Sequence, residues 1–347
     1  MTSHDDLRMN RRSFLTAGGA AIASAAGLSL GENGRLSAAM AADAKPLSFQ
    51  LSWVKSIQYG GYFAGIEHGI YKKHGADPTF VSGGPNIDPV ANVASGQSGL
   101  GDRPIGPLIL AREKGIPIKV IGTVFQKSPF SIMSLAKTPI RTIKELSGKT
   151  IASATSGRPM LVHLIKQSGV DPQSVNIVPS SPDPSALVSG QIDAYSGYST
   201  NQGVMLQQRG VELFFINVHG LGLPETTGTI YGREDYLTTN RELVVNFLRA
   251  TAESWRYGLD HPEETAKLMV DKYGNPGLNY DAQLTEIKVS KPFIEALPGQ
   301  KGLLSLDTAL FAKIIDLYRD VGMIKSEMKV SELCDSSYID AALTSKS

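Results

Sequence analysis

The chain has little cysteine, little excess charge and no long apolar run in its main part, and each shortage excludes a class of protein. Cys334 is the only cysteine among 347 residues, so no intrachain disulfide can form and the fold must rely on its hydrophobic core. The formal net charge is +1 and charged residues make up 19%, which suggests no basic face and makes nucleic acid a poor candidate partner. No uninterrupted run of about 18 apolar residues follows the N-terminal segment, so we expect no membrane-spanning helix there.

Motifs of common enzyme chemistry are also missing from the sequence. The histidines at 68, 74, 163, 219 and 261 are scattered, without the spacing of metal ligands. No Gly-x-Ser-x-Gly motif positions a nucleophilic serine. We therefore assign no catalytic residue, no metal site and no cofactor.

What the sequence does contain begins with a segment typical of an export signal. Arg11 and Arg12 precede Phe14-Leu15, and residues 17–30 are small or apolar and carry no charge. This layout indicates the twin-arginine pathway, and 39–41 and 42–44 offer small-x-small cleavage sites. A retained anchor is the alternative, but the core of about 14 residues is shorter than the roughly 20 that span a bilayer. We therefore expect residues 1–44 to be a signal peptide and the remainder to act in the periplasm, where there is no free pool of ATP or NAD.

From Leu47 onward, short runs typical of strands alternate with amphipathic runs typical of helices, which predicts an α/β fold. The first module has predicted strands at 47–53, 79–82, 98–102 and 118–125, and helices at 61–73, 89–95 and 107–114. The second has predicted strands at 131–137, 149–153, 175–179 and 191–196, and helices at 143–146, 158–168, 183–189 and 201–209. After an extended run at 229–232, only helices are predicted, at 241–260, 262–273, 281–294 and 305–321.

Such a chain can form three separate domains, or it can return to its first module. The return is favoured because the candidate crossings, 131–137 and 229–232, are short extended runs rather than Gly/Ser-rich linkers. We expect one lobe from residues 45–130 and 233–347, and a second lobe from residues 131–232. Two crossings permit hinge bending, which lets a cleft close around a solute.

Several segments resemble a known family of solute-binding proteins. They are 51–64, 83–89, 94–97, 126–129, 146–151, 197–202, 247–251, Trp255 and 262–263. In order and spacing they are similar to binding proteins that serve ABC importers for thiamine-precursor pyrimidines, riboflavin, alkanesulfonates and related small molecules. The fungal pyrimidine synthases of thiamine biosynthesis share this fold. The resemblance covers roughly residues 47–290, and it implies a two-lobed periplasmic-binding-protein fold of type II with a helical C-terminal tail, a ligand in the interlobe cleft and a membrane permease as partner.

Aromatic residues are the first candidates for ligand contact. Trp53, Tyr59 and Tyr62 lie where a predicted strand ends and the next helix begins, which is where α/β sheets bind ligands. Their rings suit a flat heterocycle through stacking. Packing in the core is the alternative use of these rings.

Polar segments of both lobes complete the expected pocket. The turn at 82–85 and the helix start at 155–158 can offer backbone N–H groups to an anion or a carbonyl, although a plain tight turn and a plain N-cap are the alternatives. The remaining candidates for ligand contact are Gly84, Pro85, Arg103, Ser128, Ser156, Gly157, Tyr198, Ser199 and Asn201.

Two departures from the family pattern bear on the ligand. The pyrimidine binders typically have Gly-Tyr-Glu-Thr-Asn-Glu, whereas Ser199 and Gln202 occupy the two glutamate positions here. Uncharged side chains accept hydrogen bonds from an amino group less strongly than carboxylates do. Arg103 stands where a small residue is usual, and its guanidinium can clamp a carboxylate or sulfonate. Pairing with Asp102 or a surface acid is the alternative role for Arg103. The two departures favour a neutral or anionic ligand over an aminopyrimidine.

Two other functions share this fold. The pyrimidine synthases carry a cysteine-rich iron-binding run and a lysine–histidine pair that meets pyridoxal phosphate, but the stretch 102–107 supplies neither lysine nor histidine. We therefore expect a protein that is not an enzyme. A binding protein that signals to a membrane sensor would have the same lobes, so the sequence leaves that alternative open. We expect a monomeric periplasmic binding protein that delivers a small heteroaromatic or anionic solute to an ABC permease.

Overall fold

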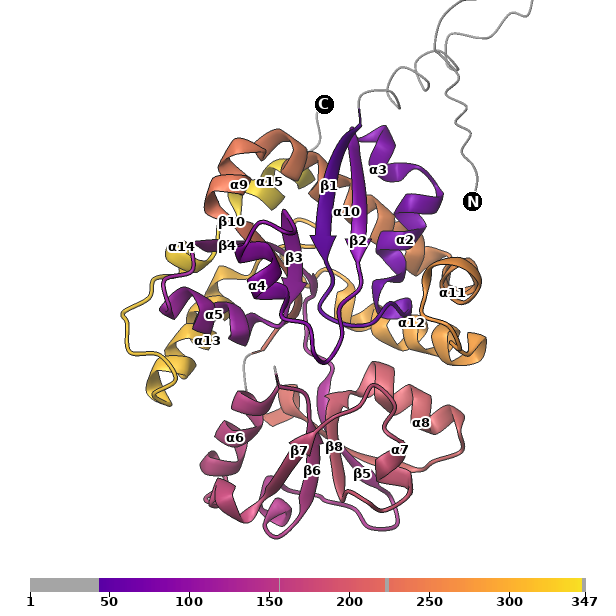
Figure 1. Cartoon of the computed structure of the whole chain (residues 1–347), viewed down its shortest axis with the longest axis vertical. Helices are drawn as coiled ribbons and strands as arrows, with labels where there is room; N and C mark the ends of the chain where they lie inside the picture. Colours follow the sequence, from indigo (N-terminus) through magenta and orange to yellow (C-terminus); the bar gives the residue numbers. More distant parts are fainter. Residues whose placement is uncertain (1–43, 156, 222–224, 345–347) are drawn as a thin grey trace, which may run out of the picture.

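The computed structural model describes residues 44–155, 157–221 and 225–344. They form two α/β lobes, each built on a five-stranded sheet, stacked along the long axis of the molecule (Figure 1). The first sheet has the order β2-β1-β3-β10-β4 and contains β1 (Lys45–Gln50), β2 (Ala76–Val81), β3 (Leu100–Arg103), β4 (Ile118–Phe125) and β10 (Thr227–Arg233). The second has the order β7-β6-β8-β5-β9 and contains β5 (Phe130–Leu135), β6 (Thr150–Ser153), β7 (Asn176–Pro179), β8 (Ala194–Tyr198) and β9 (Leu213–Asn217). The fold is α/β with two lobes, as the sequence predicts.

The crossings between the lobes are not the runs that the sequence suggested. β10 lies antiparallel between β3 and β4, and β5 lies antiparallel between β8 and β9. The chain therefore crosses a first time between β4 and β5, at residues 126–129, and a second time between the end of β9 and the start of β10. The predicted crossings 131–137 and 229–232 are wrong, and residues 227–232 pair with the first sheet rather than the second. A short internal strand and a short crossing strand have the same apolar composition, so their sequences alone do not separate them.

Helices surround both sheets. Around the first sheet lie η1 (Ile57–Tyr59), α2 (Gly60–Glu67), α3 (Ile70–Lys73), α4 (Pro89–Ala94), α5 (Ile105–Glu113), α9 (Glu234–Thr239), α10 (Arg241–Asp260), α11 (Pro262–Leu268), η6 (Met269–Tyr273), α12 (Tyr280–Ile294), α13 (Thr308–Asp320), α14 (Val330–Leu333) and α15 (Ser337–Leu343). The second sheet has η2 (Ile143–Leu146), α6 (Arg158–Gln167), η3 (Pro172–Ser174), α7 (Ser185–Val188), η4 (Ser199–Gly203), α8 (Val204–Gln208) and, after β9, η5 (Val218–Leu221). The helix predicted over 61–73 is divided because Gly69 adopts a left-handed conformation with φ 64°. Of the helices in the described ranges, none combines the length and apolar character needed to cross a membrane.

The C-terminal helices belong to the first lobe because they cover the open edge of its sheet. β4 is an edge strand, yet all but one of its residues are buried. The backbone N–H of Asp335 donates to the carbonyl of Val120 (2.9 Å), and the N–H of Thr123 donates to the carbonyl of Leu304 (3.1 Å). These bonds use edge groups that would otherwise be open to pairing with another chain.

Close packing of α2 against α10 fixes the part of the first lobe that leads to Trp53. A Cβ on Gly61 would lie 2.3 Å from Cδ2 of Trp255, and a Cβ on Gly258 would lie 3.2 Å from Cα of Gly61. Only glycine allows this approach of the two helices. The position of α2 then fixes η1 and the loop after β1, which carries Trp53.

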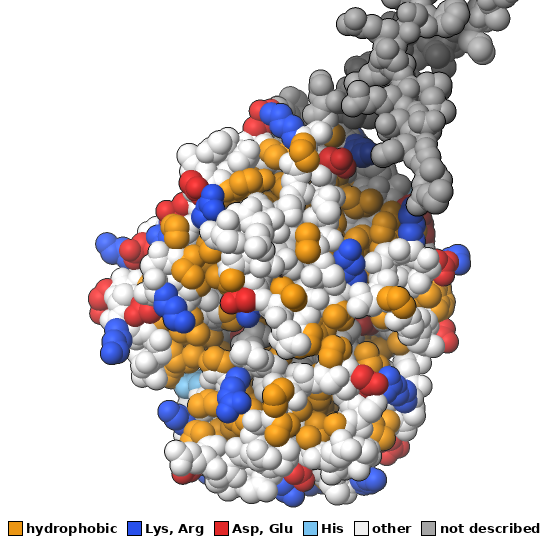
Figure 2. Space-filling view, viewed as in Figure 1, with side chains coloured by type: hydrophobic (Ala, Val, Ile, Leu, Met, Phe, Trp, Pro, Cys, Tyr) orange, Lys and Arg blue, Asp and Glu red, His pale blue; other side chains and the backbone are white. Residues whose placement is uncertain are grey.

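Charged side chains of both signs are spread over both lobes on the face shown in Figure 2, and neither sign gathers into a continuous area there. This view agrees with the near-zero net charge of the chain.

Candidate ligand-binding site

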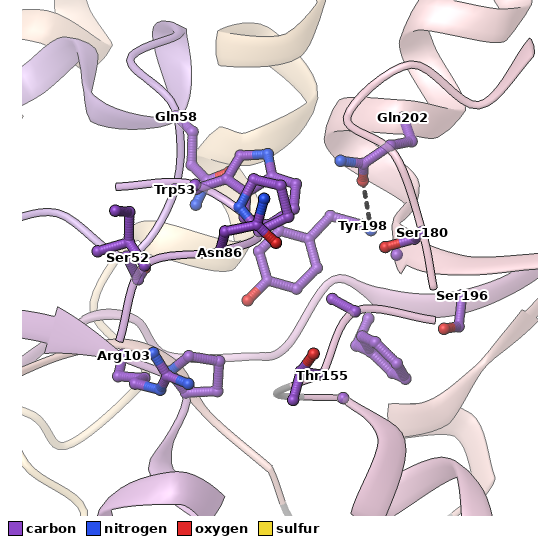
Figure 3. Close-up of a pocket in the computed structure, with 18 of the residues that line it drawn as sticks. Ser52, Trp53, Gln58, Asn86, Arg103, Thr155, Ser180, Ser196, Tyr198 and Gln202 are labelled. Atoms are coloured by element: carbon purple, nitrogen blue, oxygen red, sulfur yellow. Dashed lines mark hydrogen bonds between the residues drawn. The ribbon is translucent and has the colours of Figure 1, made fainter. Parts of the chain in front are cut away.

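A cavity of about 410 Å³ lies between the two lobes (Figure 3). Its first-lobe wall follows the carboxyl ends of β1, β2 and β3, and its second-lobe wall follows those of β6, β7 and β8, which is the usual place for ligands in α/β sheets. The described lining residues are Ser52, Trp53, Gln58, Gly84, Pro85, Asn86, Ile87, Asp88, Arg103 and Pro104 on the first side, Phe130, Ala154, Thr155, Gly157, Ser180, Tyr195, Ser196, Gly197, Tyr198 and Gln202 on the second, and Glu225 in the second crossing.

Trp53 is held at the cavity by hydrogen bonds behind it. Its backbone N–H donates to Oη of Tyr59 (2.9 Å). The N–H and Oγ–H of Ser52 donate to the two carboxylate oxygens of Asp102 (2.9 and 2.8 Å). Burial raises the pKa of Asp102 to about 6, although the bonds from Ser52 and the charge of Arg103 act to lower it. Tyr59 therefore positions Trp53 and does not itself line the cavity.

Tyr62 packs in the first-lobe core, not in the cavity wall. The residue is 1% exposed, and its ring centroid lies 4.9 Å from that of Phe80 and 5.7 Å from that of Trp255. Aromatic rings gain from burial and from tilted or edge-on packing against one another. The core alternative is therefore the one that the structure shows for this residue.

Arg103, at the end of β3, faces the cavity (Figure 3). Its side chain is 14% exposed, and the one salt bridge it makes within the described ranges is a long one, 3.8 Å from Nη1 to Oδ1 of the largely exposed Asp88. Its Nε is buried and has no hydrogen-bond partner among the described residues. The guanidinium therefore keeps donors that its protein neighbours do not use.

Tyr198 forms the corresponding wall of the second lobe. It ends β8 and leads into η4, a π-helical turn of the kind frequently found at functional sites. Oε1 of Gln202 accepts the backbone N–H of Tyr198 (2.9 Å; dashed in Figure 3). The Tyr198 hydroxyl forms a hydrogen bond with Oγ1 of Thr227, in β10 of the first lobe. Burial and the charges of Glu225 and Asp102 raise its pKa well above the usual range, so the phenol stays neutral.

Ser199 and Asn201 do not line the described cavity. Oγ of Ser199 donates to the carbonyl of Pro129 (3.1 Å). Nδ2 of Asn201 donates to both carboxylate oxygens of Glu286 on α12 (2.8 and 2.7 Å). Ser199 therefore joins the second lobe to the first crossing, and Asn201 joins the second lobe to the first lobe.

Glu225, which the sequence analysis did not single out, lies in the second crossing and lines the cavity. Oγ of Ser128, in the first crossing, donates to its Oε2 (2.9 Å). This bond ties the two crossings together, so Ser128 supports Glu225 and does not line the cavity. Burial raises the pKa of Glu225 to about 7, against the lowering effect of the bond from Ser128.

The predicted residues thus divide into two groups. Those that line the cavity are Trp53, Gly84, Pro85, Arg103, Gly157 and Tyr198, while Tyr59, Tyr62, Ser128, Ser199 and Asn201 do not. Ser156 lies outside the described residues, and contact of any of these residues with a ligand stays a prediction. Among the polar lining residues that were missed, Ser52 and Ser180 come within two residues of a strand end, and that position was the signal that could have identified them.

Known proteins similar to this chain include binding proteins and an enzyme. Riboflavin-binding protein RibY of Chloroflexus aurantiacus is 23% identical over 335 residues, which cover 87% of this chain and 89% of RibY. A 4-amino-5-hydroxymethyl-2-methylpyrimidine phosphate synthase of Legionella pneumophila is 23% identical over 224 residues, 63% of this chain and 71% of that protein.

Solved structures share the fold. The alkanesulfonate-binding protein SsuA of Xanthomonas axonopodis pv. citri, solved with bound MOPS, matches with a TM-score of 0.66 at 18% identity, over 84% of this chain and 98% of that chain. The family model described as NMT1/THI5 like matches residues 56–265, more than half of the sequence. The chain belongs to the NMT1/THI5-like family.

Proposed function

We propose that this protein is the periplasmic solute-binding component of an ABC importer and that it holds a small aromatic solute between its lobes. The observation that carries the proposal is the cavity of about 410 Å³ that both lobes line, with Trp53 on one wall and Tyr198 on the other. Its volume suits a small organic molecule, and indole and phenol rings suit a flat ligand. Support also comes from RibY, a relative named for binding riboflavin.

The two crossings explain how such a pocket would work. A ligand that contacts both lobes binds the closed arrangement more tightly than an open one, so it shifts the population toward closure. A membrane permease would then recognise the closed, loaded form. We propose export by the twin-arginine pathway on the strength of Arg11 and Arg12, in a segment that lies outside the described residues, and we propose that the exported protein acts as a monomer.

We propose binding rather than catalysis, although one relative is named as a synthase. The described wall of the cavity contains no lysine, histidine or cysteine. Those are the groups that the resemblance associates with pyridoxal phosphate and iron in the pyrimidine synthases. Across the described ranges, no group of three or more His, Cys, Asp or Glu side chains is placed to hold a metal ion.

Calorimetric titration of the purified, exported protein tests this proposal. Riboflavin, benzenesulfonate and an aminopyrimidine represent the solute classes, and we expect at least one of them to bind. Trp53→Ala should weaken that binding about tenfold or more, because a stacked ring is worth roughly 1.4 kcal/mol or more in a desolvated pocket. Tyr280→Ala is the matched control, since Tyr280 is an exposed ring (37%) on α12 that does not line the cavity. Absence of binding by all three solutes, or equal effects of the two substitutions, would contradict the proposal.

A further inference from the structure

Two ionisable side chains of opposite charge type face the cavity from different parts of the fold. Arg103 comes from the end of β3 in the first sheet, and Glu225 comes from the second crossing, two residues before β10. The two share the same cavity but have no salt bridge with each other in the structure. Each is therefore left with hydrogen-bonding capacity toward the cavity.

Arg103 has the features of an anion-binding group. Its guanidinium is largely removed from solvent, its contact with Asp88 is long, and its Nε lacks an acceptor within the described part of the chain. A buried cation is costly unless an anion and hydrogen-bond acceptors surround it. A carboxylate or sulfonate in the cavity would supply both, in the bidentate geometry that guanidinium favours.

Glu225 has the features of a group that accepts from a donor. Only its Oε2 receives a hydrogen bond from the described residues, and that bond comes from Ser128. The other oxygen is available to a ligand, and burial makes the free carboxylate hard to ionise. A ligand N–H or O–H placed there would satisfy the open oxygen and stabilise the ionised form.

Two aromatic residues, Trp53 and Tyr198, line the same cavity as Arg103 and Glu225. The charges of both Glu225 and Arg103 reach the Tyr198 hydroxyl, the first raising its pKa and the second lowering it. A ring stacked on this wall would thus carry its substituents toward both charged groups.

We propose that the ligand is a dipolar aromatic molecule whose anionic substituent lies on Arg103 and whose N–H or O–H donor lies on Glu225. This inference rests on the proposed binding function and adds the substrate class. A simple anion would leave the second carboxylate oxygen of Glu225 without a donor, and a simple cation would face Arg103. A molecule that carries both an anionic substituent and a hydrogen-bond donor would satisfy Arg103 and Glu225 together.

A probe series isolates each half of the inference. The three isomers of aminobenzoate carry both groups at different separations, benzoate carries only the anion, and aniline carries only the donor. We expect the best aminobenzoate to bind the purified protein at least about tenfold more tightly than benzoate or aniline, which corresponds to roughly 1.4 kcal/mol. Titration calorimetry measures each affinity directly.

Two substitutions assign the groups. Arg103→Gln should remove the advantage of aminobenzoate over aniline, and Glu225→Gln should remove its advantage over benzoate. Glu242→Gln is the matched control, because Glu242 is an exposed acid on α10 that does not line the cavity, and it should change the ratios little. A thermal unfolding midpoint close to that of the wild-type protein shows that each variant is folded.

The outcomes separate this inference from the proposed function. If riboflavin binds and depends on Trp53, but no aminobenzoate is preferred over benzoate and aniline, the binding function stands and the dipolar inference is overturned. Unchanged ratios in Glu225→Gln or Arg103→Gln also overturn it. If neither riboflavin nor any probe binds up to millimolar concentration, both proposals fail.

Discussion

Replacing Glu286 by glutamine should remove a pH-dependent part of the stability of the first lobe. Glu286 lies on α12, is 3% exposed, and accepts hydrogen bonds from Nδ2 of Asn201 in the second lobe. Burial raises the pKa of its carboxyl to about 8, and the bonds from Asn201 oppose this only partly. Glutamine keeps the shape and the acceptor oxygen but cannot ionise.

The sign of the effect follows from the two pKa values. In the unfolded chain Glu286 loses its proton near 4.5, whereas in the folded protein it keeps the proton until about 8. Between these values the folded state binds one proton more, so this contribution is complete below pH 4.5 and is lost as the pH rises toward 8. The loss is about 1.4 kcal/mol per pH unit, or roughly 2 kcal/mol between pH 6 and pH 7.5.

Urea unfolding at these two pH values, followed by tryptophan fluorescence, measures the effect. The buried Trp255 reports the first lobe. We expect Glu286→Gln to gain about 2 kcal/mol over the wild-type protein on going from pH 6 to pH 7.5. Glu242→Gln, an exposed acid on α10, is the control and should show no such change. Equal pH slopes for wild type and Glu286→Gln would refute the argument, because they would mean that folding does not hold the proton on Glu286.

Two further predictions test the placement of the aromatic residues. Tyr62→Phe should leave ligand affinity unchanged because Tyr62 packs in the core. Tyr59→Phe should weaken ligand affinity several-fold because the Tyr59 hydroxyl accepts the N–H of Trp53. Calorimetric titration of both variants with a solute that binds the wild-type protein measures the two affinities, and a larger loss in Tyr62→Phe than in Tyr59→Phe would contradict the assignment. Gly61→Ala should destabilise the protein by about 1–3 kcal/mol, since the added methyl would lie 2.3 Å from Cδ2 of Trp255, and an unchanged thermal unfolding midpoint would show that α2 and α10 pack less closely.

Strongly patterned elements could be predicted from the sequence. The apolar run of β4 was placed over its full length at 118–125, and α10 was placed at 241–260, because a long periodic run has one favourable arrangement. β9 (Leu213–Asn217) was not predicted, and β5 and β10 were taken for crossings. Their assignment depends on which strands they pair with, and pairing between segments about 100 residues apart leaves no local pattern in the chain.

The site shows the same division between local and long-range information. Trp53 and Arg103 could be predicted because each stands at or just after the end of a recognisable strand. Tyr198 could be predicted because it matches a cleft position of the family that the sequence resembles. The orientation of Tyr62 could not, because the phase of α2 is set by the contact of Gly61 with Trp255, about 190 residues further along. Asn201 was expected at the ligand, but its partner Glu286 lies on a helix that the local sequence does not connect with it.

Glu225 shows why the charge of the pocket could not be deduced from the motif positions alone. The neutral residues Ser199 and Gln202 suggested that the pocket had lost its acids. The structure instead brings a carboxylate into the cavity from the second crossing, in a hydrogen bond with Ser128 from the first. An acid in a crossing belongs to no periodic pattern, so its position in the cavity wall becomes visible only in the folded structure, where Ser128 and Glu225 meet. The bond between Ser128 and Glu225 joins the two segments that must bend when the lobes close. A ligand that forms a hydrogen bond with Glu225 would therefore contact the hinge as well as the pocket.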